Sequence, residues 1–326
     1  MEMPNCNFAL IGTAGYIAPK HMKAMVDNGG NLVVAFDQHD SVGVLDSYFP
    51  NTSFFTEYER FDRHLEKIRR SPGDAVNYVA VCSPNYLHDA HCRLALRIGA
   101  HAICEKPLVI NPWNLDQLRE LEQVYGKQIY TVLQLRLHPE VVKLREAWAT
   151  ETTGKKAEVC LTYITRRGRW YNHSWKGDEV RSGGLAMNIG VHFFDFLLWI
   201  FGGVQRNFLH LSQPTRMSGV LELERARIRW FLSIDANDLP KEVAAKGDYA
   251  YRSISVDGTE VDLSAGFVDL HSQVYQSILA GEGFGTHEAQ PAIDLVYQLR
   301  NSIEVPCRED AHPWLQSGNP SVDPAE

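Results

Sequence analysis

Short apolar runs alternate with helically spaced segments through about the first 135 residues, and this alternation constrains the fold more than any other feature. Such a pattern favours parallel βαβ units. We expect strands at 8–11, 32–36, 75–81, 102–104 and 129–133, and helices at 17–28, 61–70, 88–98 and 113–125. Gly99 fits the end of the third helix and Pro112 the start of the fourth.

After about residue 157 the pattern becomes a series of strand-like segments joined by turn signals. We expect strands at 158–164, 205–211, 218–223, 227–234, 250–256 and 260–263, a hairpin turn at Asp257-Gly258, and helices at 267–280 and 288–302. The predicted fold class is α/β, with a parallel-sheet domain at 1–134. An α+β domain at 135–326 would be built on an open, mixed, largely antiparallel sheet, and its polar end, 317–326, is expected to fray.

Composition and charge exclude several classes of function. A formal net charge of −8 argues against general binding to nucleic acids or anionic membranes. The apolar stretch 193–203 is shorter than a membrane span and contains Asp195, and residues 1–6 lack the basic start of a signal peptide. The six cysteines include no CxxC pair and are expected to be reduced thiols in a cytoplasmic protein.

The first strand is followed by Gly12-x-x-Gly15-x-x-Ala18, which opens the first helix. Glycines at such a turn let the backbone approach a pyrophosphate, although the first gap is one residue longer than in the usual G-x-G-x-x-G/A pattern. Alone, the turn fits any βα connection. Asp37 ends the second strand, where a carboxylate binds ribose hydroxyls and repels a 2′-phosphate, so the sequence predicts NAD rather than NADP.

Two further segments follow predicted strands of the same sheet. One is the segment Ser83-Pro84-Asn85-Tyr86-Leu87-His88, whose polar groups are placed to line a dinucleotide. The alternative is that Asn85 only caps the next helix. Glu105-Lys106-Pro107 follows the apolar run 101–103. A lysine is costly to bury, but the carboxyl edge of an α/β sheet is where such sheets bind ligands.

With Gly-Gly-x-x-x-Asn-x-Gly-x-His-x-x-Asp at 183–195, these motifs resemble the glucose–fructose oxidoreductase/inositol dehydrogenase (Gfo/Idh/MocA) family over nearly the whole chain. The resemblance implies a Rossmann domain and a mixed-sheet domain whose open face forms the substrate pocket and oligomer contacts, so we expect a homotetramer. It also implies that Lys106 is the catalytic lysine and that His192 lies near the reacting hydroxyl. Many members have Asp where this chain has Asn188, which places more weight on His192.

Segments 134–139, 165–171, 174–179, 186–195 and 266–271, with Tyr275, are similar to one branch of the family, 3-dehydrogenases of UDP-N-acetylglucosaminuronic acid. This implies NAD-dependent oxidation of the sugar C3 hydroxyl, on the pathway to diacetamido uronic acids of bacterial surface polysaccharide such as lipopolysaccharide O-antigen. The NADH formed is either released or reoxidised in place by a 2-oxo acid such as 2-oxoglutarate. Met187 stands where the branch has Thr, which leaves another sugar or a cyclitol as an alternative substrate.

Oxidation of a secondary alcohol needs a base for the hydroxyl proton. His192 suits that task with an intrinsic pKa near ~6.5, and so does Lys106 if burial beside a positive nicotinamide lowers its pKa; the sequence does not rank them. The resemblance gives three sets of site residues. The catalytic set is Lys106, His192 and Asn188; the cofactor set is Gly12, Gly15, Tyr16, Ile17, Asp37, Ser83, Asn85, His88, Glu105, Lys106, Gln134 and Trp175; the substrate set is Lys106, Arg136, Arg166, Arg169, Tyr171, Asn188 and His192.

The segment 166–181 is basic in an acidic chain, with five cationic side chains against Asp178 and Glu179. Trp170, Tyr171 and Trp175 lie among them, which favours an anionic, ring-containing ligand over a merely solvated surface.

The histidines form no recognisable ligand set with nearby acids, so no metal is expected. Two other functions remain open. One is an NAD-dependent glycosidase that oxidises C3 transiently, and the other is an NAD-binding regulator without activity.

Overall fold

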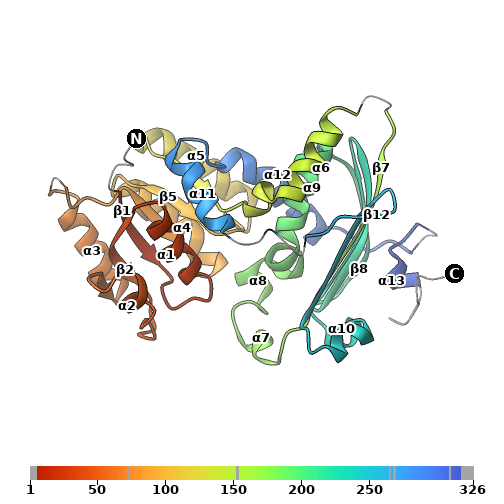
Figure 1. The fold of residues 1–326 in the computed structure, drawn as a ribbon, viewed down its shortest axis with the longest axis horizontal. Helices are drawn as coiled ribbons and strands as arrows, with labels where there is room; N and C mark the ends of the chain where they lie inside the picture. Colours follow the sequence, from red (N-terminus) through yellow and green to blue (C-terminus); the bar gives the residue numbers. More distant parts are fainter. Residues whose placement is uncertain are drawn as a thin grey trace. The chain divides into compact units, whose positions relative to one another are not determined.

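The computed structural model describes residues 6–71, 73–151, 154–263, 266, 269–307 and 310–316. The chain divides into two compact units, one made of 1–137 and 268–290 and the other of 138–267 and 291–326 (Figure 1). The N-terminal unit therefore includes residues 268–290, from late in the chain. The sequence analysis placed a single domain boundary after residue 134, which does not allow for this segment, and that boundary stays a prediction. The predicted frayed end, 317–326, lies outside the described residues.

The N-terminal unit contains a six-stranded parallel sheet in the order β3-β2-β1-β4-β5-β6. Its strands are β1 (Asn7–Ile11), β2 (Asn31–Phe36), β3 (Ser53–Phe55), β4 (Tyr78–Val81), β5 (His101–Cys104) and β6 (Ile129–Thr131). The predicted parallel α/β class is confirmed, and β3 is a strand that the sequence analysis missed. Because the strand order reverses between β1 and β4, a ligand crevice is expected at the carboxyl ends of these two strands, as in Rossmann folds.

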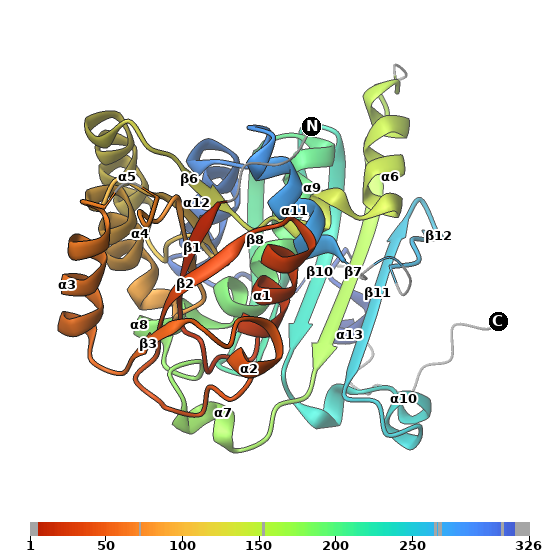
Figure 2. The ribbon, with the colours of Figure 1, turned by 60° about the vertical axis from the view of Figure 1, so that its left-hand side comes forward.

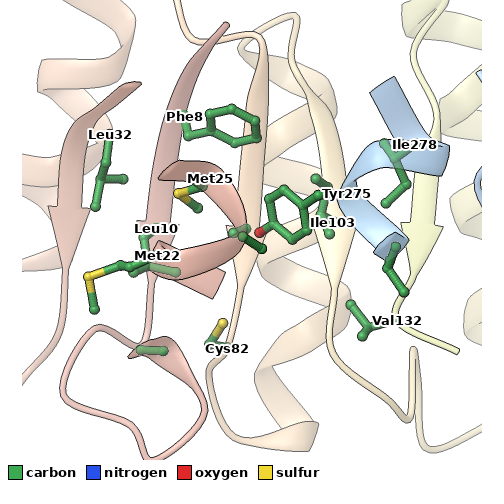
Figure 3. Close-up of a cluster of buried hydrophobic side chains, with 14 of the residues drawn as sticks. Phe8, Leu10, Met22, Met25, Leu32, Cys82, Ile103, Val132, Tyr275 and Ile278 are labelled. Carbon is green, nitrogen blue, oxygen red and sulfur yellow. The ribbon is translucent and has the colours of Figure 1, made fainter. Parts of the chain in front are cut away.

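The helices of this unit are α1 (Ala18–Asp27), α2 (Leu45–Tyr48), α3 (Tyr58–Ile68), α4 (His88–Arg97), α5 (Pro112–Tyr125) and α11 (Leu270–Leu279), with 3₁₀ turns η1 (Asn85–Leu87) and η2 (Gln134–Leu137). Met22 and Met25 are spaced to share one face of α1, and both are buried with Phe8 of β1. Tyr275 of α11 joins the same cluster, its ring centroid 5.8 Å from that of Phe8 (Figure 3). Helix α11 is thereby fixed beside α1.

The second unit is built on a sheet in the order β12-β11-β7-β10-β9-β8 (Figure 2). Its strands are β7 (Ala157–Thr165), β8 (Val204–Ser212), β9 (Arg216–Leu223), β10 (Ala226–Ser233), β11 (Ala250–Val256) and β12 (Thr259–Glu260). β7 and β10 are parallel and the other pairs are antiparallel, which confirms the predicted mixed, largely antiparallel sheet. Asp257 and Gly258 have φ values of 48° and 80° and form the hairpin turn between β11 and β12.

Helix α9 (Val191–Phe201) packs on this sheet. The ring centroid of Phe194 lies 5.3 Å from that of Trp230, and that of Phe193 lies 4.7 Å from that of Tyr163. Helix α9 continues α8 (Glu179–Ser182) and a π-helical turn (Ala186–Gly190), and the whole stretch 179–201 is long and apolar enough to cross a membrane. Its most apolar window is 72% buried in the structure, which is the environment of a core helix.

The remaining helices are α6 (Pro139–Ala149), α7 (Trp170–His173), α10 (Lys241–Ala245), α12 (Thr286–Arg300) and α13 (Pro313–Gln316).

Two buried histidines are expected to make stability fall with acidification. Burial, with Arg229 nearby, lowers the pKa of His312 to about 3, and burial, with His88 nearby, lowers that of His91 to about 4. In an unfolded chain both would titrate near ~6.5. Below that pH both histidines bind a proton in the unfolded state but not in the folded state. The free energy of unfolding should therefore fall by about 1.4 kcal/mol per pH unit for each histidine. Urea unfolding at pH 7.5 and 5.5 measures this, and His312→Gln should reduce the loss; an equal loss in the variant would contradict the assignment.

Candidate active site

The turn after β1 has room only for glycine at two positions. Gly12 has φ of +90°, and a Cβ added there would lie 2.6 Å from the carbonyl carbon and oxygen of Cys82. A Cβ on Gly15 would lie 2.9 Å from the carbonyl oxygen of Gly12. Helix α1 begins directly afterwards, and no side chain caps its N-terminus. A bare backbone leading to an uncapped helix N-terminus fits a dinucleotide pyrophosphate.

Asp37 lies beside this turn at the end of β2. Its Oδ2 accepts a hydrogen bond from the Ala14 amide and its Oδ1 accepts one from the His39 amide, both at 2.9 Å. Each oxygen keeps a lone pair for a ribose hydroxyl. Tyr16, also predicted at the cofactor, is 85% exposed, and Ile17 next to it is the residue before α1.

Removing the Asp37 charge is expected to weaken discrimination against NADP. Asp37→Ser keeps an acceptor for the Ala14 amide but no longer repels a 2′-phosphate. The ratio of the NADP and NAD dissociation constants should fall about tenfold, which corresponds to about 1.4 kcal/mol of binding free energy. Calorimetric titration with both dinucleotides measures the ratio, and an unchanged ratio would show that Asp37 does not face the ribose.

The predicted polar segment after β4 is engaged within the protein. Ser83 Oγ lies 2.8 Å from Nδ1 of His91. The ring of His88 is buried, with Nε2 2.8 Å from the Ser83 carbonyl oxygen and Nδ1 2.7 Å from that of Pro107. Burial lowers the pKa of His88, against the effect of the two carbonyl oxygens, which favour the imidazolium. His88 therefore ties the segment after β4 to the one after β5. Asn85, in η1, is buried.

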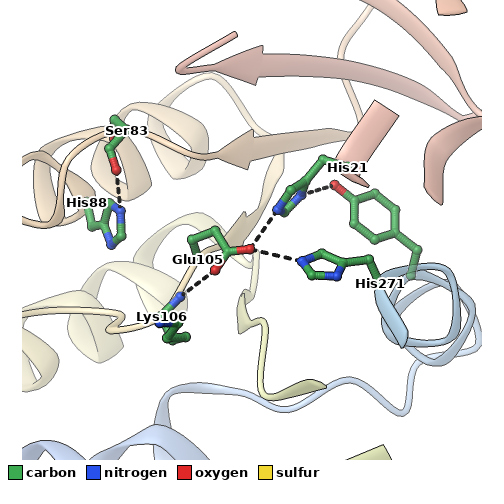
Figure 4. Close-up of polar contacts among 7 residues, drawn as sticks. His21, Ser83, His88, Glu105, Lys106 and His271 are labelled. Carbon is green, nitrogen blue, oxygen red and sulfur yellow. Dashed lines mark hydrogen bonds and ion pairs between the residues drawn. The ribbon is translucent and has the colours of Figure 1, made fainter. Parts of the chain in front are cut away.

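Glu105 and Lys106 follow β5, as predicted for a strand exit. Glu105 Oε1 lies 3.0 Å from Nε2 of His21 and 3.1 Å from Nε2 of His271, and its Oε2 accepts a hydrogen bond from the Lys106 amide at 3.2 Å (Figure 4). Burial raises the pKa of Glu105, but the hydrogen bonds from the two histidines hold it well below its usual value. Glu105 is therefore an ionised carboxylate next to the predicted catalytic lysine.

The sequence analysis missed the two histidines as partners of Glu105. The three ligand atoms of His21, Glu105 and His271 all lie within 4.8 Å of one another, so the group is also a candidate metal site, although no metal was expected. One signal was available in the sequence: His271 and Tyr275 are four residues apart in a predicted helix and share a face.

The second unit brings together another set of predicted residues. Asn188, in the π-helical turn, donates a hydrogen bond from Nδ2 to the hydroxyl oxygen of Tyr171 at 2.8 Å. Tyr171 is buried, and burial raises its pKa. His192 follows Asn188 by four residues at the start of α9, and its ring is tilted by 55° to that of Phe193, with centroids 4.9 Å apart. The predicted action of Lys106 and His192 on one hydroxyl stays a prediction.

Acidic groups compensate only part of the basic segment 166–181. Arg181 pairs with Asp178 at 3.4 Å, and Glu179 pairs with Arg300 at 3.8 Å. No ion pair is found among the described residues for the four other cations, Arg166, Arg167, Arg169 and Lys176. Lys176 Nζ lies 5.5 Å from the ring centroid of Trp170 and 5.7 Å from that of Trp175, and burial lowers its pKa. The uncompensated charge fits an anionic ligand.

Two predicted residues lie in η2. Gln134 has a buried side-chain oxygen without a hydrogen-bond partner among the described residues, which fits a contact to a ligand. Arg136 is buried, donates from Nη2 to the Glu288 carbonyl oxygen at 2.9 Å, and lies 5.2 Å from the ring centroid of Phe284. These contacts anchor Arg136 within its own unit; its predicted substrate contact stays a prediction.

Comparison with known proteins assigns both halves of the chain. Residues 6–133 match the model of an oxidoreductase family with an NAD-binding Rossmann fold (Gfo/Idh/MocA), and residues 155–292 match the C-terminal α/β domain of the same family. The WlbA (WbpB) dehydrogenase from Thermus thermophilus is 49% identical, with a TM-score of 0.90, over 95% of this chain and 99% of its own. It was crystallised with NAD and α-ketoglutarate, and with NAD and UDP-GlcNAcA.

Other relatives are more distant. The WlbA dehydrogenase from Bordetella pertussis shares the fold at 16% identity, with a TM-score of 0.74 over 94% of this chain and 98% of its own. D-glucoside 3-dehydrogenase from Escherichia coli is 29% identical over 127 residues, which are 38% of this chain and 35% of that protein. The chain spans 35%, 55% and 42% of the lengths of the first three curated relatives that it matches.

Proposed function

We propose that this chain, which belongs to the Gfo/Idh/MocA oxidoreductase family, catalyses the NAD-dependent oxidation of the C3 hydroxyl of UDP-N-acetylglucosaminuronic acid. One observation carries the proposal: the Thermus thermophilus dehydrogenase, 49% identical over 95% of this chain, was crystallised with NAD and this sugar nucleotide. The glycine turn, Asp37, Lys106 and His192 supply the residue types that the reaction needs.

NAD, when bound, accepts the hydride from the carbinol carbon. The protein supplies position and proton handling. We assign the turn Gly12–Ile17, Asp37 and Gln134 to the dinucleotide. Lys106 and His192 hold the reacting hydroxyl and remove its proton, as either a neutral imidazole or an uncharged lysine can. Asn188, which is tied to Tyr171, orients the sugar next to His192.

The charge of the substrate matches the basic segment. UDP-N-acetylglucosaminuronic acid carries a pyrophosphate and a carboxylate, and Arg166, Arg167, Arg169 and Lys176 have no acidic partner among the described residues. Arginine suits planar carboxylate and phosphate groups, and the interleaved tryptophans suit the uracil or the sugar face. We assign the four cations of this segment to the substrate anions, and Trp175 keeps its predicted place at the cofactor.

Three further properties belong to the proposal. We place the reaction in the cytoplasm, in keeping with six free cysteines. We infer that 2-oxoglutarate reoxidises bound NADH, because the Thermus thermophilus dehydrogenase was crystallised with α-ketoglutarate. We also expect a homotetramer, because the open sheet of the second unit needs cover.

The test is a substrate panel. The purified protein is incubated with NAD, 2-oxoglutarate and either UDP-N-acetylglucosaminuronic acid, UDP-N-acetylglucosamine or myo-inositol, and products are identified by mass spectrometry. The proposal predicts a ketone product and 2-hydroxyglutarate only with the uronic acid. Turnover of the neutral sugars alone would refute the substrate assignment, and release of free sugar without net redox change would instead indicate a glycosidase.

A further inference from the structure

Glu105 receives buried side chains from two helices that lie far apart in the sequence, on the side of the carboxylate away from Lys106. We propose that His21, His271 and Tyr275 are positioning residues: they fix the Glu105 carboxylate, which in turn fixes the backbone that carries Lys106. This inference rests on the proposed function only in giving Lys106 a catalytic role.

The cluster is buried and is assembled from three separate segments of the chain. His21 comes from α1, His271 from α11 and Glu105 from the segment after β5 (Figure 4). Tyr275 also belongs to α11. Their exposed fractions are 0% for His21, 0% for Tyr275, and 7% for both Glu105 and His271. The rings of His21 and His271 meet edge to face with centroids 5.2 Å apart. Water therefore has little access to this carboxylate, and it depends on protein donors.

Proton positions in the cluster follow from Glu105. Its ionised Oε1 can only accept a hydrogen bond, so the ring proton of His21 is on Nε2, facing Glu105. Burial lowers the pKa of His21, which leaves Nδ1 as the acceptor for the hydroxyl of Tyr275 at 2.8 Å. His271 donates from its own Nε2 in the same way. The Nε2–H groups of two histidines and the Lys106 amide thus donate to one ionised carboxylate.

A metal ion would disturb this arrangement, even though the three ligand atoms are close enough to bind one. Coordination needs both Nε2 atoms without protons, which moves the His21 proton to Nδ1. Nδ1 would then donate to Tyr275, whose own proton would lose its acceptor, since no other partner of that hydroxyl is found among the described residues. The contacts favour the hydrogen-bonded network.

The network reaches the lysine through the backbone. Oε2 of Glu105 holds the amide of Lys106, while His88 lies against the carbonyl oxygen of Pro107 on the other side of the lysine. The backbone is therefore held at the amide of Lys106 and again at the carbonyl group of the next residue, Pro107. Small displacements of a catalytic group can cost about 10²-fold in rate, so loss of one donor to Glu105 should appear in kcat.

The test compares two substitutions at His271. Gln keeps an N–H donor near the position of Nε2, and Leu has similar bulk but no donor. His271→Leu is expected to lower kcat between about 10- and 100-fold, with KM for the sugar nucleotide and the NAD dissociation constant within about threefold of the parent values. His271→Gln should retain most of kcat. Gln273→Leu, at an exposed position of the same helix, is the matched control and should leave kcat unchanged.

A second readout needs no sugar, so it separates this inference from the proposed substrate. Acylation of Lys106 by acetic anhydride, followed by peptide mass spectrometry, should change in rate at least about threefold in His271→Leu and stay near the parent rate in His271→Gln. Absence of turnover in the parent protein would refute the proposed function alone. Equal acylation rates in all variants, equal kcat losses in Leu and Gln, or one zinc ion per chain that disappears in His271→Leu would overturn the inference.

Discussion

Lys106→Met is expected to lower turnover of UDP-N-acetylglucosaminuronic acid about 10³-fold while NAD still binds. The ammonium group is the one cation that the chain places directly after β5, at the carboxyl edge of the parallel sheet. Without it the reacting oxygen loses a proton acceptor or a stabilising charge, and such groups contribute about 10²- to 10⁴-fold. Methionine keeps the unbranched shape of the side chain up to the ε position and removes only the ammonium group, so the loss is chemical rather than steric. Single-turnover kinetics measures it.

Two controls accompany this variant. Lys67→Met, at an exposed position of α3, should leave kcat unchanged. NAD affinity and the unfolding temperature of Lys106→Met should stay near those of the parent protein, because the hydrogen bond from the residue 106 amide to Glu105 is kept in the variant. A Lys106→Met protein that retains a tenth or more of the activity would remove Lys106 from the chemistry.

Gly12→Ala is expected to destabilise the N-terminal unit and to abolish NAD binding. The new methyl group would lie 2.6 Å from the Cys82 backbone, and φ of +90° is itself unfavourable for alanine. Adding the backbone strain to the overlap gives a loss of roughly 2 to 5 kcal/mol in the free energy of unfolding. If the chain still folds, β1 and β4 must move apart at the crevice, and the pyrophosphate loses its bare backbone. Denaturant unfolding and NAD titration measure the two effects.

Gly99→Ala separates the two causes. Gly99 has φ of +81°, but a Cβ there would meet nothing within 4 Å. The free energy of unfolding of Gly99→Ala should fall by about 1 to 2 kcal/mol, from the backbone conformation alone. NAD affinity should be unchanged. Equal effects of the two alanine variants would mean that the close approach of Gly12 to Cys82 has no energetic importance.

Periodicity predicted the larger elements of both sheets because their apolar spacing repeats over many residues. It missed β3, since Ser53–Phe55 is three residues long, and α2, since Leu45–Tyr48 is four. Segments this short carry no readable period. The predicted helix 267–280 is observed from Leu270 to Leu279, and its first two residues lie outside the described part of the chain.

The sequence singles out candidate site residues where they stand in short motifs. The glycine turn, the strand-end lysine and the Asn188–His192 spacing are all of this kind, and their roles stay proposals. The Glu105 cluster is not local, because its histidines are 84 and 166 residues away. The basic segment was read from composition alone, and pairing of Arg181 with Asp178 removes part of the predicted excess. Only the folded chain shows which charges are already compensated.

The most direct test of the proposed reaction uses UDP-N-acetylglucosaminuronic acid carrying deuterium at C3. The labelled sugar is incubated with the protein, NAD and 2-oxoglutarate, and the label is followed by mass spectrometry and NMR. If oxidation takes place at C3, the sugar product loses the deuterium. The deuterium then appears in the nicotinamide ring or in 2-hydroxyglutarate. A ketone product that retains its deuterium would show oxidation at another carbon and would contradict the proposal.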